Sequence, residues 1–203
     1  MNSKDKNQKI SGGQAIVNTL KAEEVSHVFG LIGSATMELF DALYDAKSIK
    51  LIDVRDERTG THMADGYARA SGKPGIIIAG QNGPGATNLV TGVAQAKAAF
   101  SPVISIAGAI STEHEGKDAF QEVDQQSLFE PITKKTLTVR QTELIPQILK
   151  KAFSLALTPR CGPVHVNFPR NILANECKFG EIQKHKRKKL SSIKESDLIN
   201  ILK

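Results

Sequence analysis

The residues best suited to chemistry are a glutamate and a glycine-rich turn, each of which follows an apolar segment. Glu57 comes after the apolar run 49–54 and just ahead of a helix-like stretch, 61–69. A second strand-to-helix turn, 80–88, reads Gly-Gln-Asn-Gly-Pro-Gly-Ala-Thr-Asn. A carboxylate can accept a hydrogen bond or relay a proton, and glycines let the backbone approach a ligand closely. Together the two features predict a cofactor site.

The turn does not match the dinucleotide fingerprint. It reads G-x-x-G-x-G over residues 80–85, whereas the fingerprint is G-x-G-x-x-G. Pro84 also removes a backbone N–H from the part of the turn that would cradle a phosphate, which argues against a diphosphate-binding role here. Two interpretations stay open, because the glycines can serve a ligand or only the geometry of a tight turn. Glu57 likewise has a structural alternative, as a helix-initiating carboxylate or an ion-pair partner of Arg55 or Arg58.

Other kinds of chemistry find no support in the residue pattern. The chain has no Ser-His-Asp, H-E-x-x-H or calcium-loop arrangement, so hydrolase and metalloenzyme functions are disfavoured. The two cysteines, Cys161 and Cys177, form no C-x-x-C pair and have no metal-ligand spacing to a histidine. We therefore expect no metal ligands in this chain.

Apolar segments alternate with helix-like segments along most of the sequence. A first helix is predicted to begin at Ser11, which forms a capping box with Gln14, and to end near Glu24. Continuous apolar strands separated by helices indicate a parallel sheet covered on both faces, so the predicted fold class is α/β. Ligands bind such sheets beyond the carboxyl ends of the strands, where Glu57 falls. The predicted strands are 28–32, 49–54, 75–79, 102–107, 136–139 and 162–168, with a late helix at 144–157.

Length and charge indicate one domain with a basic appendage. The chain has 203 residues and a formal net charge of +6, and the seven basic residues and one acidic residue between positions 178 and 194 account for the whole excess. That stretch has no interleaved aromatic residues, which favours a solvated linker over nucleic-acid binding. No apolar run approaches the roughly 20 residues needed to span a membrane. We expect a cytoplasmic protein without a nucleic-acid or membrane partner.

The motifs resemble the pyrimidine-binding domain of thiamine diphosphate enzymes of the acetolactate synthase type. The matching strings are Val28–Gly33, Glu57 followed by Met63–Arg69, Gly83–Asn88 and Gly162–Val164. They stand in the order and spacing of the family and cover about residues 10 to 175. The resemblance implies a pyrimidine-binding domain at residues 1–175, followed at 176–203 by a basic linker and the start of a further domain.

The resemblance also implies a role for individual residues. Glu57 would hydrogen-bond the N1′ atom of the cofactor's aminopyrimidine and favour the imino tautomer, whose nitrogen removes the thiazolium C2 proton. The residues that would line the pyrimidine are Ile32, Gly33, Pro84 and Asn88. The residues that would approach the substrate are Phe120 and Gln121. Glu57 is thus the expected acid/base relay.

Within the family, three short strings are most similar to sulfoacetaldehyde acetyltransferase. These strings, 31–35, 80–85 and 120–125, imply conversion of sulfoacetaldehyde and phosphate to acetyl phosphate and sulfite. The alternatives are an acetolactate synthase-type carboligase and a catalytically silent partner module. One departure from the family is Asp56, which stands where a histidine is common and could raise the pKa of Glu57 or point to solvent.

The family binds the cofactor's diphosphate through Mg²⁺, held by a G-D-G motif and a later asparagine in a separate domain. This chain contains no G-D-G motif. The resemblance therefore implies that Mg²⁺ is bound by a domain outside this chain, and that the chain works in a homo-oligomer or with a partner chain that carries the diphosphate-binding domain. We expect the chain alone to be inactive.

Overall fold

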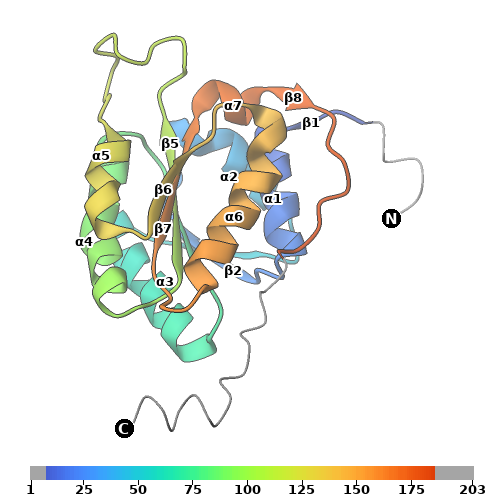
Figure 1. Cartoon of the computed structure of the whole chain (residues 1–203). Coiled ribbons are helices and arrows are strands. Elements are labelled where there is room, and N and C mark those ends of the chain that lie inside the picture. The colour runs from blue at the N-terminus through green and yellow to red at the C-terminus, as the bar shows by residue number, and fades with distance from the viewer. Residues whose placement is uncertain (1–7, 186–203) are drawn as a thin grey trace, which may run out of the picture.

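The computed structural model describes residues 8–185, which form a parallel six-stranded sheet between two layers of helices (Figure 1). The strand order is β3-β2-β4-β5-β7-β6, and each neighbouring pair is parallel. The predicted α/β class is confirmed. The sheet strands are β2 His27–Gly30, β3 Lys50–Asp53, β4 Gly75–Ala79, β5 Val103–Ala109, β6 Lys135–Thr138 and β7 Val164–Pro169. The helices are α1 Gly12–Ala22, α2 Met37–Tyr44, α3 Glu57–Ser71, α4 Pro84–Ala98, α5 Gln125–Phe129, α6 Ile145–Leu157 and α7 Arg170–Ala174.

The central strand β4 shows why both faces of the sheet are covered. Successive side chains of a strand point to opposite faces, so Ile76 and Ile78 pack in one cluster with α1, α2 and α6, whereas Ile77 and Ala79 pack in the other with α3 and α4. All four side chains are fully buried. Burying an isoleucine side chain stabilises a fold by about 1.5–3 kcal/mol. A strand that is buried on both faces, such as β4, therefore needs an uninterrupted run of apolar residues.

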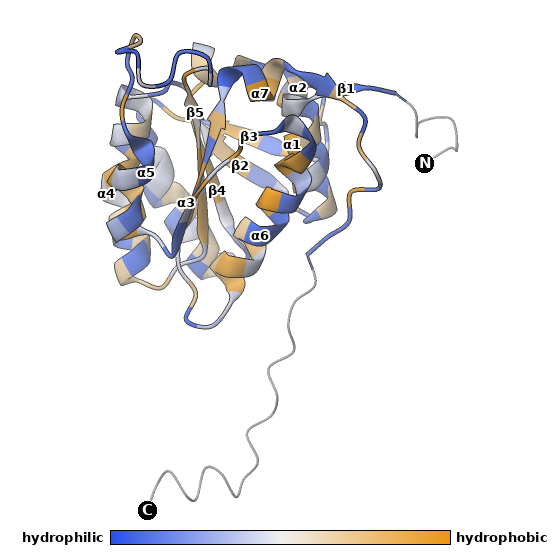
Figure 2. Cartoon of the chain, turned by 45° about the horizontal axis from the view of Figure 1, so that its top comes forward, coloured by the Kyte–Doolittle hydropathy of each residue, from blue (hydrophilic) through white to orange (hydrophobic). Residues whose placement is uncertain are grey.

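The two helical layers differ in the size of their buried side chains. On one face, large residues such as Leu39, Leu149 and Phe153 fill the core. On the other, the contact between α3 and α4 is built from small residues, and a Cβ at Gly92 would lie 2.5 Å from the Cβ of Thr61. Figure 2 shows hydrophobic residues gathered along the strands and on the inward side of α6. The α3 and α4 backbones consequently pack closely.

The ends of two helices refine the predictions. The capping box of Ser11 and Gln14 is present, but α1 ends at Ala22, shortly before Glu24 takes a positive φ of 59°. Helix α3 begins at Glu57, earlier than the helix-like stretch at 61–69, because the Asp56 side chain accepts a hydrogen bond from the Arg58 N–H and caps it.

The strand order places a change of direction between β2 and β4. From β2 the chain moves outward through α2 to β3, and then returns through α3 to place β4 on the other side of β2. Turns that leave β2 and β4 therefore run to opposite faces of the sheet, and such a change of direction is where ligands bind open α/β sheets. The turn 31–36, the start of α3 and the turn 80–83 all lie at this carboxyl edge.

The chain beyond residue 175 continues to pack on the domain as far as it is described. β8, Glu176–Cys177, pairs antiparallel with β1, Ile10–Ser11. His185 donates its backbone N–H to the buried Glu23 carboxylate over 2.7 Å. Residues 186–203, which hold most of the predicted basic linker, lie outside the described residues. Between residues 8 and 185, no helix combines the length and apolar character needed to cross a membrane.

Candidate functional site

Glu57 occupies the first position of α3 and is buried, with 3% of its surface exposed. Its Oε2 atom accepts a hydrogen bond from Asn88 Nδ2 over 3.0 Å. Among the described residues, no hydrogen-bond donor reaches the other oxygen, Oε1. A buried carboxylate with one oxygen anchored and the other unengaged is a suitable acceptor for an N–H group of a ligand.

The unengaged oxygen lies beside the start of α4. A Cβ at Gly85 would stand 3.0 Å from Glu57 Oε1, which is closer than a side chain tolerates without displacing the carboxylate. Gly85 is in the first turn of α4, where the helix macrodipole presents its positive end to a carboxylate. Pro84 precedes it at the first position, where a missing N–H costs little. The glycine therefore leaves the space that Glu57 uses.

The Asp56 side chain binds Arg58 and makes no hydrogen bond with Glu57. Its Oδ1 caps α3 through the Arg58 N–H at 2.8 Å, and its Oδ2 lies 3.2 Å from the Arg58 guanidinium. The structure therefore shows Asp56 as a partly exposed helix cap that is ion-paired with Arg58.

Gln81 joins three segments that are distant in the sequence. Its Oε1 accepts hydrogen bonds from Ser34 Oγ at 2.9 Å and from the Ala35 N–H at 3.3 Å. Its Nε2 donates to Gln121 Oε1 over 2.7 Å. The side chain thus links the turns after β2, β4 and β5. Gln81 belongs to the predicted glycine-rich turn but had no predicted role, because nothing local indicates which segments lie beside it.

The glycines of these turns serve close contacts between backbones. A Cβ at Gly33 would lie 2.2 Å from the Gly80 carbonyl oxygen, and a Cβ at Gly83 would lie 2.4 Å from that of Gln121. Gly83 also has a φ of +53°, in the region that favours glycine. Asn82 adds a hydrogen bond from its Nδ2 to the Gln121 carbonyl over 3.0 Å. The positive φ of the turn therefore explains why a glycine stands at position 83. The same glycine lets the turn pack against the β5–α5 loop.

The remaining predicted site residues lie at the exposed margin of the same edge. Ile32 is 62% exposed and Phe120 is 82% exposed, while Pro84 and Asn88 are also exposed. Gln121 is partly buried and has a φ of 61°, which is unusual for a residue other than glycine. The structure brings Glu57 and Asn88 into direct contact, and brings Gln121 against the 80–85 turn. Ile32 and Phe120 offer apolar surface on adjoining turns.

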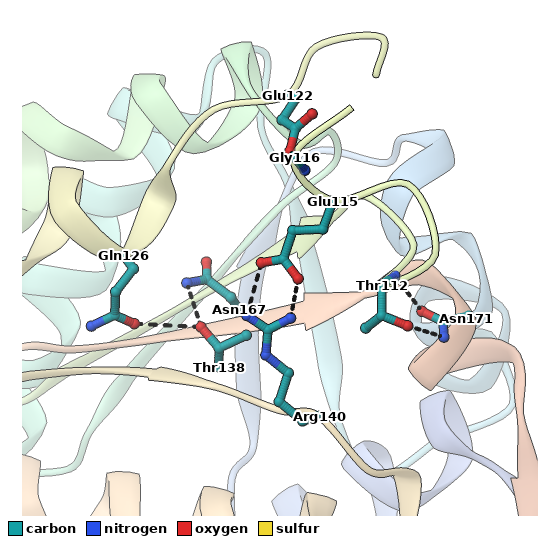
Figure 3. A network of polar contacts seen from close by, with 9 residues as sticks. All are labelled: Thr112, Glu115, Gly116, Glu122, Gln126, Thr138, Arg140, Asn167 and Asn171. Carbon is teal, nitrogen blue, oxygen red and sulfur yellow. Dashed lines mark hydrogen bonds and ion pairs between the residues drawn. The ribbon is translucent and has the colours of Figure 1, made fainter. Parts of the chain in front are cut away.

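A cavity of about 450 Å³ lies beyond the carboxyl ends of β5, β6 and β7. It includes Asn82, and so adjoins the glycine-rich turn on the side away from Glu57. Figure 3 shows Gln126, Thr138 and Asn167 at this edge, joined by hydrogen bonds of 3.4 Å and 3.3 Å. Within the described part of the chain, no three histidine, cysteine or acidic side chains gather as they would to hold a metal ion.

A buried histidine supports this edge from inside the sheet. His165 lies between Ser105, 2.8 Å from its Nδ1, and Asn167, 2.7 Å from its Nε2. Its ring stacks on Phe129. Complete burial lowers the pKa of His165 to about 3, in spite of the opposing hydrogen bond with Asn167. The imidazole is therefore neutral near pH 7, and it fixes the orientation of the Asn167 amide.

Known proteins match this chain across most of its length. Residues 10–128 match the family model of the thiamine pyrophosphate enzyme, N-terminal TPP binding domain. The chain is 44% identical to the probable acetolactate synthase large subunit of Methanocaldococcus jannaschii over 167 residues, which are 82% of this chain and 28% of that protein. It is 43% identical to the acetolactate synthase isozyme 3 large subunit of Escherichia coli over 164 residues, which are 81% and 28% of the respective chains. The chain thus spans less than a third of these relatives.

The comparison with these relatives changes the predicted subfamily. They carry the name acetolactate synthase, and the comparisons do not support the predicted closeness to sulfoacetaldehyde acetyltransferase. That prediction depended on three short strings at 31–35, 80–85 and 120–125, whereas the identity to the acetolactate synthases extends over more than 160 residues. The alternative prediction of an acetolactate synthase-type protein is the better supported one.

Proposed function

This chain belongs to the thiamine pyrophosphate enzyme family, and from that membership we propose that it is the pyrimidine-binding part of an acetolactate synthase-type carboligase. Such an enzyme acts on a 2-oxo acid such as pyruvate. The observation that carries the proposal is the Glu57 carboxylate, which is buried and anchored by Asn88 through one oxygen. Its second oxygen is the group that a ring N–H of the cofactor would meet.

The residues around Glu57 fit an aminopyrimidine ring. Gly33 and Gly80 let the turns after β2 and β4 pack closely, Gly83 lets the glycine-rich turn pack against Gln121, and the exposed side chain of Ile32 offers an apolar face to a flat ring. Glu57 Oε1 is a hydrogen-bond acceptor at the base of this group. Pro84 and Asn88 lie on the first turns of the adjacent helix. When bound, thiamine diphosphate supplies the carbanion chemistry of the family.

The contribution of this chain to that chemistry is to hold a proton in place. Asn88 fixes one oxygen of Glu57, so the other keeps a defined direction. We propose that Phe120 and Gln121 approach the substrate from the β5–α5 loop. Mg²⁺ and the cofactor's diphosphate are assigned in this proposal to a domain outside the described residues, in the same assembly or in a partner chain.

The test is an activity assay of the complete enzyme that contains this chain. With pyruvate, thiamine diphosphate and Mg²⁺, we expect acetolactate to form, and we expect Glu57→Gln to lower kcat by at least about 100-fold, within the range of positioned acid/base groups. The control is Glu24→Gln, which removes a carboxylate of similar size at the opposite end of the sheet. Full activity of Glu57→Gln would contradict the role of Glu57.

Two further outcomes identify the alternatives. Release of sulfite from sulfoacetaldehyde and phosphate, without acetolactate from pyruvate, would return the assignment to sulfoacetaldehyde acetyltransferase. Equal cofactor affinity of the partner domain with and without this chain would indicate a catalytically silent module.

A further inference from the structure

The loop between β5 and α5, residues 110–124, carries two of the proposed substrate-facing residues. It is largely hydrophilic (Figure 2), so it has little apolar surface with which to hold itself on the domain. Gln121 adopts a left-handed conformation that a non-glycine residue keeps only where its surroundings impose it. The contacts that fasten the loop therefore decide whether Gln121 is in place.

Both ends of the loop are fastened to the domain. At its start, Thr112 accepts a hydrogen bond from Asn171 Nδ2 over 2.9 Å and returns one from its backbone N–H to Asn171 Oδ1 over 3.2 Å. At its end, Gln125 donates to the Gly108 carbonyl oxygen over 2.9 Å. These contacts close the base of the loop but leave its tip, residues 113–119, to be held by other means.

The tip is tied to the edge of the sheet by an ion pair (Figure 3). The Arg140 guanidinium binds both carboxylate oxygens of Glu115, with one nitrogen–oxygen distance of 2.8 Å. The remaining hydrogen bonds of the tip with described residues run within the loop. Arg140 lowers the pKa of the Glu115 carboxyl, although desolvation and Asp124 oppose it, so the pair is charged at neutral pH.

A second carboxylate connects the tip to Gln121. Glu122 accepts hydrogen bonds from the Gly116 N–H at 2.6 Å and the Ala119 N–H at 3.0 Å. Gly116 follows Glu115 in the sequence, and Glu122 follows Gln121. These bonds connect the tip to Glu122, the neighbour of Gln121, and Gln121 in turn contacts Gln81 and Asn82 of the glycine-rich turn.

We propose that Glu115 and Arg140 are positioning residues, which hold the β5–α5 loop against the domain and thereby set the places of Phe120 and Gln121 beside the substrate. The kinetic part of this inference rests on the proposed function, whereas the loop contact itself does not. The pair also forms part of the wall of the 450 Å³ cavity, so the loop lines one side of that space.

The first experiment measures amide hydrogen exchange in the full chain. Exposed ion pairs contribute about 0.2–1 kcal/mol, so we expect Glu115→Gln and Arg140→Gln to speed exchange at Gly116 and Ala119 by about 1.4- to five-fold. The reversed pair, Glu115→Arg with Arg140→Glu, should restore protection. Glu24→Gln, which breaks the exposed pair with Lys184 elsewhere, should leave the loop unchanged. Unchanged exchange in the single variants, or no recovery in the reversed pair, would overturn the inference.

The second experiment measures kinetics of the complete enzyme. Loss of the pair lowers the fraction of molecules with an ordered loop, so KM for the 2-oxo acid should rise in inverse proportion to that fraction, by at most the factor found in exchange, with a smaller change in kcat. The reversed pair should recover KM. An unchanged KM would refute the positioning role. If Glu57→Gln is fully active, the proposed function fails while the exchange result for the loop still stands, so the two failures are distinguishable.

Discussion

The contact between Glu57 and Asn88 can be tested by a double-mutant cycle on stability. Asn88→Ala removes the donor 3.0 Å from Glu57 Oε2 and leaves that buried oxygen without its partner. Hydrogen bonds to charged groups contribute about 1.5–3 kcal/mol. Because Asn88 itself is exposed, we take the lower end and expect a loss of about 1.5 kcal/mol in the free energy of unfolding. For a chain of this size the midpoint of thermal unfolding would fall by about 3–6 °C.

The second arm of the cycle replaces the charge. The side-chain amide introduced by Glu57→Gln retains a carbonyl oxygen that accepts from Asn88, so Asn88→Ala in this background should cost only the roughly 0.5–1 kcal/mol of a neutral hydrogen bond. The expected coupling energy is therefore about 0.5–1 kcal/mol, measured by urea unfolding at pH 7.5. As a control, Asn171→Ala removes an amide that pairs with Thr112, and its effect should add to that of Glu57→Gln. A coupling below about 0.3 kcal/mol for Asn88 would refute the charged contact.

Three further predictions concern stability. Gly83→Ala places a Cβ 2.4 Å from the Gln121 carbonyl oxygen at a φ of +53°, so urea unfolding should show a loss of about 2 kcal/mol. Gly66→Ala, in the exposed middle of α3 with open space around its Cβ position, should instead add about 0.5–1 kcal/mol in the same assay. Burial lowers the pKa of His165 from 6.5 to about 3, so the stability that depends on its neutral form is complete above pH 6.5 and is lost as the pH falls, by up to about 1.4 kcal/mol per pH unit. Urea unfolding at pH 7.5, 6 and 5 should therefore show a shallower pH dependence in His165→Gln than in the unsubstituted chain. An equal dependence in the two proteins would contradict the buried neutral histidine.

The fold was largely predictable because its strands are buried on both faces. A strand such as 75–79 has no polar face, so it appears as an unbroken apolar run, and the structure has β4 at these residues. Helix ends were less accurate. The start of α3 at Glu57 depends on capping by Asp56, a residue that was interpreted from the sequence only as a neighbour of the catalytic candidate.

The sequence and the family resemblance predict candidate site residues but not the contacts that support them. Glu57 and Asn88 were predicted together by resemblance, and the structure brings them into contact. The linking role of Gln81 and the ion pair of Glu115 with Arg140 depend on which strands lie side by side. Strand order is set by pairing between distant segments, so no local pattern reveals it. These supports therefore emerged only from the three-dimensional structure.

The neighbouring positions of β2 and β4 have a consequence for the order in which the fold forms. Phe29 lies opposite Ile77 in the sheet, so the chain must bring together residues 48 positions apart before this pairing begins. Contacts of such long range form more slowly than the local contacts within a helix. We therefore expect helical contacts to form before β2 and β4 pair, and the turns 31–36 and 80–83 to come together at the carboxyl edge only with that pairing.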